Sequence, residues 1–137
     1  MKEEKKHFLE YQGPVMFWAL VIFVLSSIPG SCYPSVNFVG ADKVVHFFLY
    51  FFLGGLSYIA LRFQDRKMFL RVYAGWLSLV ICVLYGASDE LHQLLTPGRS
   101  CELLDWAADC LGASIGLLVT IGLVLWYEAR TSAGETY

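Results

Sequence analysis

Four long apolar runs, separated by short polar segments, dominate the sequence. They cover about residues 15–30, 43–61, 72–90 and 103–127. The first is short, whereas the other three are close to or above the ~20 residues that a helix needs to cross the hydrocarbon core of a bilayer. The pattern predicts an all-α membrane protein, a bundle of four transmembrane helices in a single membrane domain over residues 1–137.

The first run has helix signals at both ends. Residues 1–13 mix polar and aromatic positions and suit an interfacial lead-in. Pro14 fits the first turn of a helix, because its missing N–H costs little there. At the other end, Ser26, Ser27 and Pro29 are expected to end or kink the helix, since proline removes a backbone hydrogen bond.

The later runs are bounded by capping and turn residues. Asp42 is expected to cap the second helix, where a carboxylate suits the positive end of the helix dipole. A basic segment, residues 62–71, follows that helix, and the sequence TPGRS at residues 96–100 predicts a tight turn before the fourth. The tail from Glu128 onward is expected to be short and disordered.

Composition supports the membrane assignment. The chain is 57% hydrophobic and 16% charged, with a mean hydropathy of +0.55, which is too apolar for an ordinary globular domain. A formal charge of −2 and the lack of a Lys/Arg stripe argue against a nucleic-acid partner. The four cysteines show no CxxC or Cys/His spacing, so we expect no zinc, haem or other cofactor.

Lysine and arginine residues are distributed unevenly between the two sides of the predicted spans. Only Lys43 and Arg99 lie on one side. The other eight are Lys2, Lys5, Lys6, Arg62, Arg66, Lys67, Arg71 and Arg130. Because cytoplasmic segments carry the excess of basic residues, both termini are predicted to be cytoplasmic in a multi-pass protein of the cell membrane.

Ionisable residues concentrate where three predicted spans reach the outer face. Residues 89–112 hold five of the twelve carboxylates, and antiparallel topology places the start of the second span at the same depth. There Asp42, His46 and Tyr50 recur every four residues and form one helix stripe. Ionisable groups at membrane depth are costly, so their presence indicates a site.

The fourth span repeats this spacing. Asp105 and Asp109 are four residues apart, and Gly112 and Gly116 continue the same face. Such a pair of small residues lets a neighbouring helix approach closely. Gly54, Gly55 and Gly86 are candidates for the same role. We therefore predict that the polar faces meet in a connected cluster around a pocket open to the outside.

These motifs resemble those of a known family. The stretches SSIPG, DKVVHFFLYFFLGG and SDELHQLLTPGRSCELLDWAADCLGASIG are similar to the pattern of the VanZ-like family of small bacterial membrane proteins, and the match covers nearly the whole chain. Asp109 stands where the family often has Asn. By this resemblance, the signature positions are Asp42, Lys43, His46, Tyr50, Asp89, Glu90, Gln93, Arg99, Asp105 and Gly112. The family takes its name from a member linked to teicoplanin resistance, which implies an effect on glycopeptide susceptibility.

One hypothesis is that the pocket binds or modifies an envelope amphiphile, such as a lipid or a lipid-linked wall precursor. Arg99 would bind a phosphate or carboxylate and Gln93 would add a neutral hydrogen bond. His46, Asp89 and Glu90 are the acid–base candidates should a reaction occur. The candidate binding residues are Asp42, Lys43, His46, Tyr50, Asp89, Glu90, Gln93, Arg99, Asp105 and Asp109.

Other interpretations remain open. The protein is alternatively a non-catalytic interaction or scaffold protein of the envelope, or an ion conduit, although a conduit needs polar groups at several depths. Lys43 and Arg99 could simply neutralise nearby carboxylates. A Mg²⁺ ion held by Asp89, Glu90 and Asp105 is conceivable, but such oxygen ligands have no diagnostic spacing, so we assign no metal. The oligomeric state is left open.

Two cysteines fall on the predicted outer side. Cys32 and Cys101 lie in separate outer loops, in a compartment where disulfides persist. A bridge would require the two loops to meet, and matching sidedness says nothing about distance. Two unrelated thiols are therefore the favoured prediction.

The predicted topology can be tested with reporter fusions. Because every loop is short enough for the basic-residue rule to apply, fusions at positions 35 and 98 should report the outside of the cell and fusions at 66 and 137 the inside. An extracellular signal from position 66 would overturn this topology and the outward pocket with it.

Overall fold

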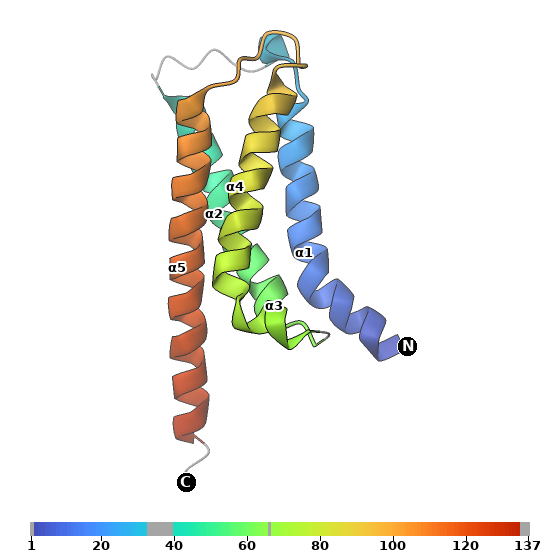
Figure 1. Cartoon of the computed structure of the whole chain (residues 1–137), viewed down its shortest axis with the longest axis vertical. Coiled ribbons are helices and arrows are strands. Elements are labelled where there is room, and N and C mark those ends of the chain that lie inside the picture. The colour runs from blue at the N-terminus through green and yellow to red at the C-terminus, as the bar shows by residue number, and fades with distance from the viewer. Residues whose placement is uncertain (1, 33–39, 66, 135–137) are drawn as a thin grey trace.

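The computed structural model describes residues 2–32, 40–65 and 67–134. Four long helices run antiparallel along the molecule (Figure 1). They are α1 (Lys2–Ser26), α2 (Ala41–Arg62), α4 (Ala74–Gln93) and α5 (Leu103–Gly134). A 3-10 turn, η1 (Gly30–Cys32), and a short helix, α3 (Met68–Val72), complete the described elements. The predicted all-α architecture of four long helices is confirmed.

All four long helices contain a segment that is long and apolar enough to cross a membrane. These segments are Phe8–Ser26, Ala41–Arg62, Ala74–Gln93 and Leu103–Ser132. Each contains many exposed apolar side chains, as expected where lipid rather than water is the solvent. The chain is therefore a multi-pass membrane protein in contact with the bilayer.

The two ends of the bundle differ. α1 begins and α5 ends at one end, where α3 also lies (Figure 1). The opposite end holds the end of α1, the start of α2 and the connection between α4 and α5. We call this the polar end. Residues 33–39 of the predicted first loop lie outside the described residues.

The closest helix pair is α2 and α5, which meet through glycines. A Cβ on Gly112 or Gly116 would collide with the backbone carbonyl of Phe47 or Phe51 in α2. Gly54 of α2 lies equally close to the α5 backbone, where a Cβ would meet the Ala113 carbonyl. The predicted role of the small residues in close packing is confirmed, and the contact brings the polar faces of the two helices together.

Side chains that donate to main-chain carbonyls connect α1 to the rest of the bundle. The Trp18 indole donates to the carbonyl of Leu49 in α2 at 2.8 Å. The Tyr85 hydroxyl of α4 donates to the carbonyl of Ala19 at 2.7 Å. Because lipid offers no alternative partner, such bonds between helices fix how α1 sits on its neighbours.

The start of α1 differs from the prediction. The helix begins well before Pro14, which lies inside it, and α1 bends in its N-terminal part (Figure 1), as the missing proline N–H permits. Tertiary contacts explain the extension. The Gln12 amide donates to the Ala60 carbonyl at 2.6 Å, and the ring of Tyr11 stacks on Phe63. The expectation that residues 1–13 precede the helix was wrong.

The predicted cap of α2 was also wrong. The N-cap residue is Gly40, whose φ of 88° is in the left-handed region, and no side chain caps the helix. Asp42 lies in the first turn, where its carboxylate accepts a hydrogen bond from Lys43 instead. The side chain of the adjacent Lys43 is therefore the main partner of this carboxylate.

The other departures concern connections and the C-terminus. The helix α3 begins within the basic segment, residues 62–71, and ends one residue after it. α5 continues past Glu128, which pairs with Arg62 at 3.1 Å, so that the expected disorder is wrong for residues 128–134. The rest of the tail, residues 135–137, lies outside the described residues. The predicted turn at residues 96–100 is confirmed, because the Arg99 N–H donates to the Thr96 carbonyl and Gly98 has a φ of 74°.

Glycine packing between α2 and α5 can be tested by adding one methyl group. Gly116→Ala should lower the free energy of unfolding by about 1–3 kcal/mol, because the helices must move apart. Gly122→Ala, on the same helix with open space around the position, should not lower it. Thermal unfolding in detergent measures both, and equal effects would show that the close contact does not stabilise the bundle.

Candidate functional site

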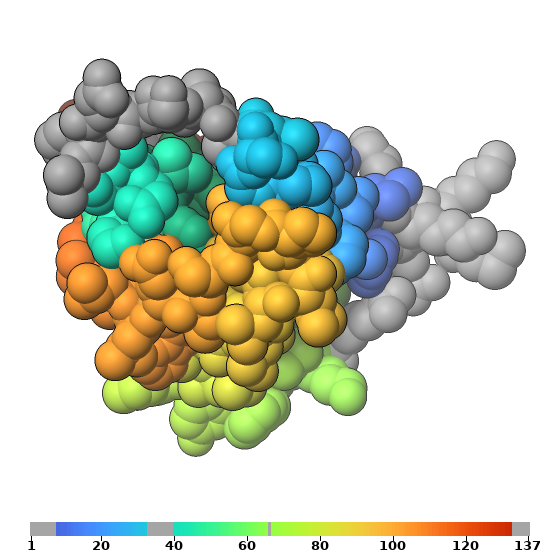
Figure 2. Space-filling model, turned by 90° about the horizontal axis from the view of Figure 1, so that it is seen from above, coloured from blue at the N-terminus to red at the C-terminus, as the bar shows by residue number. Residues whose placement is uncertain are grey.

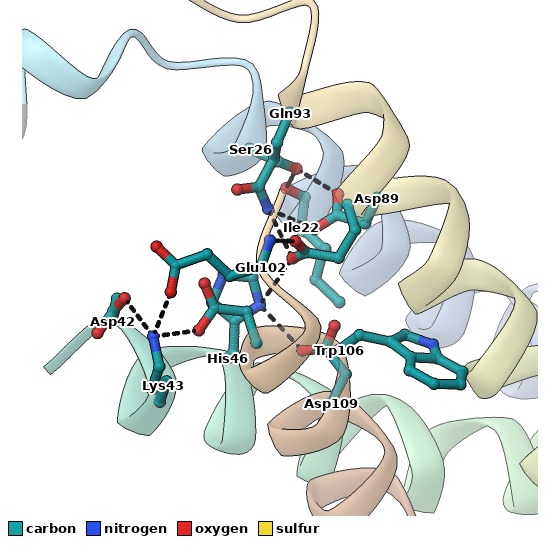
Figure 3. A network of polar contacts seen from close by, with 12 residues as sticks. Ile22, Ser26, Asp42, Lys43, His46, Asp89, Gln93, Glu102, Trp106 and Asp109 are labelled. Carbon is teal, nitrogen blue, oxygen red and sulfur yellow. Dashed lines mark hydrogen bonds and ion pairs between the residues drawn. The ribbon is translucent and has the colours of Figure 1, made fainter. Parts of the chain in front are cut away.

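Polar side chains from α1, α2, α4, α5 and the turn between α4 and α5 converge at the polar end (Figure 3). We call them the polar network. Its members are Ser26, Asp42, Lys43, His46, Asp89, Glu90, Gln93, Arg99, Glu102, Asp105 and Asp109. Most are buried, so the contacts among them replace the water that they would otherwise need.

Lys43 forms the first part of the network. Its ammonium lies 2.9 Å from carboxylate oxygens of Asp42, Glu102 and Asp105. Asp105 is the buried member, whereas the other two are partly exposed. Glu102 lies just before the membrane segment of α5, and the hydrogen bond from Lys43 lowers the pKa of its carboxyl. Lys43 therefore neutralises carboxylates from two helices.

His46 forms the second part, where three helices meet. Its Nδ1 is 3.0 Å from Asp109 Oδ1 on α5 and 3.9 Å from Glu90 Oε1 on α4. Glu90 is itself held in place, since it accepts the Glu102 N–H at 2.8 Å and the Gln93 amide at 3.3 Å. All three side chains at this point are buried.

The third part runs from α1 to the turn. The Ser26 hydroxyl donates to Asp89, and the Gln93 amide donates to the same carboxylate at 3.2 Å. The Arg99 guanidinium then donates to the side-chain carbonyl oxygen of Gln93 at 2.9 Å. Ser26 and Glu102 were not among the predicted site residues. Ser26 lies in the SSIPG stretch, but only the fold shows that its hydroxyl reaches α4.

Three buried polar atoms of this end have no hydrogen-bond partner among the described residues. One of them, Oδ1 of Asp105, lies 2.9 Å from the Lys43 ammonium and is compensated by that ion pair. The other two, the hydroxyl of Tyr50 and Oδ2 of Asp109, have no such compensation. Both residues are fully inaccessible to solvent. Because an unmade hydrogen bond in the interior is expensive, such atoms are typical of sites that bind a ligand, water or ion.

A cavity of about 510 Å³ adjoins the network. It lies among α1, η1, α2, α4 and the following turn, which surround it at the end of the molecule seen in Figure 2. Its apolar wall comes from α1 and α2, through Ile22, Leu25, Val45 and Leu49. Its polar lining comprises Ser26, Asp42, His46, Tyr50, Asp89, Gln93 and Arg99. The cavity is thus amphipathic.

The structure places the predicted residues in two groups. Asp42, His46 and Tyr50 line the cavity as the predicted stripe, together with Asp89, Gln93 and Arg99. Lys43, Glu90, Asp105 and Asp109 lie in the network outside the cavity lining. Asp105 and Asp109, although on one face, serve different partners, which are Lys43 and His46.

The three carboxylates considered as Mg²⁺ ligands, Asp89, Glu90 and Asp105, do not converge on one point. Asp89 is engaged by Ser26 and Gln93, and Asp105 by Lys43. Among the described residues, the carboxylate and imidazole groups that do converge are His46 with Glu90 and Asp109, and Asp42 with Glu102 and Asp105.

The two outer-loop cysteines are separate. Cys32 and Cys101 are both free and exposed, so that no bridge joins the two loops and the prediction of unrelated thiols agrees with the structure.

Comparison with known proteins identifies the family. A profile of the VanZ/LLP1 family matches residues 6–126, which include every member of the polar network. The chain belongs to the VanZ/LLP1 family. It is also 29% identical, over 112 residues, to an uncharacterised protein of the fission yeast Schizosaccharomyces pombe. That match covers 81% of this chain and 63% of the yeast protein, so this VanZ/LLP1 chain spans less than two thirds of that relative. No solved structure matches this chain significantly.

The role of Lys43 can be measured by removing its charge. Lys43→Met should lower the free energy of unfolding by about 3 kcal/mol or more, because Asp105 would become a buried, uncompensated charge. Asp42→Asn removes a partly exposed partner and should cost under about 1 kcal/mol. Adding Asp105→Leu to Lys43→Met should recover most of the lost free energy of unfolding. Chemical unfolding in detergent gives the values, and a double variant no more stable than Lys43→Met would contradict this role.

Proposed function

We propose that this VanZ/LLP1 protein binds an envelope amphiphile, a lipid or a lipid-linked wall precursor with an anionic head group, in the cavity at the polar end. We further propose that this end faces the outside of the cell, as the distribution of Lys and Arg favours. The single observation that carries the proposal is the amphipathic cavity, which joins an apolar wall to a dense set of polar groups at membrane depth.

The polar lining suits a head group. Arg99 offers a planar guanidinium that can pair with phosphate or carboxylate oxygens through two hydrogen bonds. Arg99 already donates a hydrogen bond to the side-chain carbonyl oxygen of Gln93, which positions the guanidinium. Tyr50 adds a buried hydroxyl with no partner among the described residues, which can donate to a ligand oxygen.

The apolar wall suits an acyl or prenyl chain. Ile22 is buried, whereas Val45 both lines the cavity and is 53% exposed on the helix surface. The cavity therefore borders the region that lipid occupies around the bundle. An amphiphile can place its head group in the polar part and leave its chain along α1 and α2, which avoids extracting the whole molecule from the bilayer.

The same groups are suitable for acid–base chemistry. His46 is held by a carboxylate at Nδ1, an arrangement that fixes the orientation of the ring. Asp89 and Glu90 are the nearby carboxylates of α4. Binding accounts for the cavity without a reaction, and we assign binding as the function. An effect on susceptibility to glycopeptides such as teicoplanin, which the family name suggests, would follow if the bound amphiphile belongs to the cell wall pathway.

Lipid analysis of the purified protein tests the proposal. Arg99→Gln should reduce one defined anionic amphiphile in the copurifying material by about tenfold, because an ionic hydrogen bond to the head group is worth roughly 1.5–3 kcal/mol. Arg130→Gln is the matched control. It removes the same charge at a position near the end of α5, far from the cavity, where Arg130 stacks on Trp126. Identical lipid profiles in the wild type and both variants would reject the binding function and favour a scaffold role.

A further inference from the structure

We propose that His46, Glu90 and Asp109 bind a divalent transition-metal ion, Zn²⁺ or Mn²⁺, at the wall of the cavity. The three residues come from α2, α4 and α5, so the ion would connect the three helices that build the polar end. The site does not depend on the proposed function. Only the further step, in which the ion binds the head group of an amphiphile, depends on it.

The distances between ligand atoms fit a metal ion. The three ligand atoms lie within 4.8 Å of one another. His46 Nδ1 is 3.0 Å from Asp109 Oδ1 and 3.9 Å from Glu90 Oε1. Ligand bonds of ~2.1 Å in a tetrahedral site separate neighbouring ligand atoms by roughly 3.4 Å, which lies between these two values. Small rotations of the side chains would complete the geometry.

Charge balance also favours a divalent cation. With a neutral imidazole, the group has two negative charges and no Lys or Arg within it, and all three side chains are at most 8% exposed. Two uncompensated charges at this depth would be costly. The neighbouring group of Asp42, Glu102 and Asp105 is different, because the Lys43 ammonium already lies 2.9 Å from each carboxylate.

An unpartnered oxygen of Asp109 gives an independent indication. Oδ2 is buried and has no hydrogen-bond partner among the described residues, although Asp109 is 0% exposed. It points toward Gly86 of α4, where an added Cβ would lie 3.1 Å from it. Glu90 lies one turn further along the same helix. Coordination through both oxygens of the carboxylate would satisfy this Oδ2 atom, which the protein leaves without a donor.

The residues around the ligands are arranged as in known metal sites. The Glu102 N–H and the Gln93 amide hold the two oxygens of Glu90, which is how outer residues orient ligating carboxylates. An imidazole with two carboxylates suits Zn²⁺ or Mn²⁺ better than Mg²⁺, which prefers oxygen ligands alone.

The ion would have open positions toward the cavity. Three protein ligands leave at least one coordination position. His46 lines the cavity beside Tyr50 and Arg99, whereas Glu90 and Asp109 lie behind it. A phosphate oxygen of a head group in the cavity could therefore coordinate the ion. This would offset the repulsion between an anionic head group and the carboxylates of the network.

Metal titration of the purified full chain tests the site. After treatment with a chelator, the wild type should bind about one Zn²⁺ or Mn²⁺ ion per chain and unfold at a higher temperature when loaded. His46→Gln and Asp109→Asn should each raise the Kd at least about tenfold. Glu128→Gln, which removes a carboxylate that pairs with Arg62 far from this site, should leave the Kd unchanged. Absence of binding to wild type, or equal weakening in all three variants, would overturn the proposal.

X-ray absorption spectroscopy of the Zn²⁺-loaded wild type gives a readout that does not depend on how the variants fold. The expected spectrum has only nitrogen and oxygen in the first shell, with imidazole scattering. Sulfur in that shell would place the ion on cysteines such as the exposed Cys32 or Cys101 and reject the site. Lipid analysis of the same samples separates the two proposals, because metal binding without any enriched amphiphile would keep the metal site and reject the lipid function.

Discussion

The contact between α2 and α5 is the constraint on which the rest of the structure depends. Glycines allow the two backbones to touch, with Gly112 and Gly116 against the carbonyls of Phe47 and Phe51. In a bilayer, lipid is as apolar as a side chain, so close van der Waals packing must supply the attraction between helices. Those carbonyls lie directly after His46 and Tyr50 in α2. The same contact therefore sets the distance from His46 to Asp109, and the site follows from the packing.

The second constraint is charge. The polar network has six carboxylates, but only Lys43 and Arg99 are permanently cationic. The structure satisfies these carboxylates in different ways: three surround Lys43, Asp89 accepts hydrogen bonds from Ser26 and Gln93, and the remaining two face His46. The last pair is the least compensated, which is why we expect an ion there rather than at Lys43.

Much of this arrangement could be predicted from sequence, because it follows from periodicity. The four spans come from runs of apolar residues, the Thr96–Arg99 turn from Pro97 and Gly98, and the shared face of Asp105 and Asp109 from helical spacing. What failed depended on contacts between distant residues. α1 extends past Pro14 because Gln12 reaches Ala60; α5 continues past Glu128, which pairs with Arg62. Ser26 reaches Asp89 for the same reason. The missing cap at Asp42 is the exception, since its carboxylate pairs with the adjacent Lys43.

The central claim is that close packing of α2 and α5 places the His46 imidazole against the Asp109 carboxylate within the membrane. Solid-state NMR on the full chain in lipid bilayers, with ¹⁵N-labelled histidine and ¹³C-labelled aspartate, measures this contact directly. A strong dipolar coupling between His46 Nδ1 and the Asp109 carboxyl carbon, absent in His46→Gln, is the predicted result, consistent with a separation of 3.0 Å between Nδ1 and Oδ1. No coupling between these two groups in a folded sample would contradict the account.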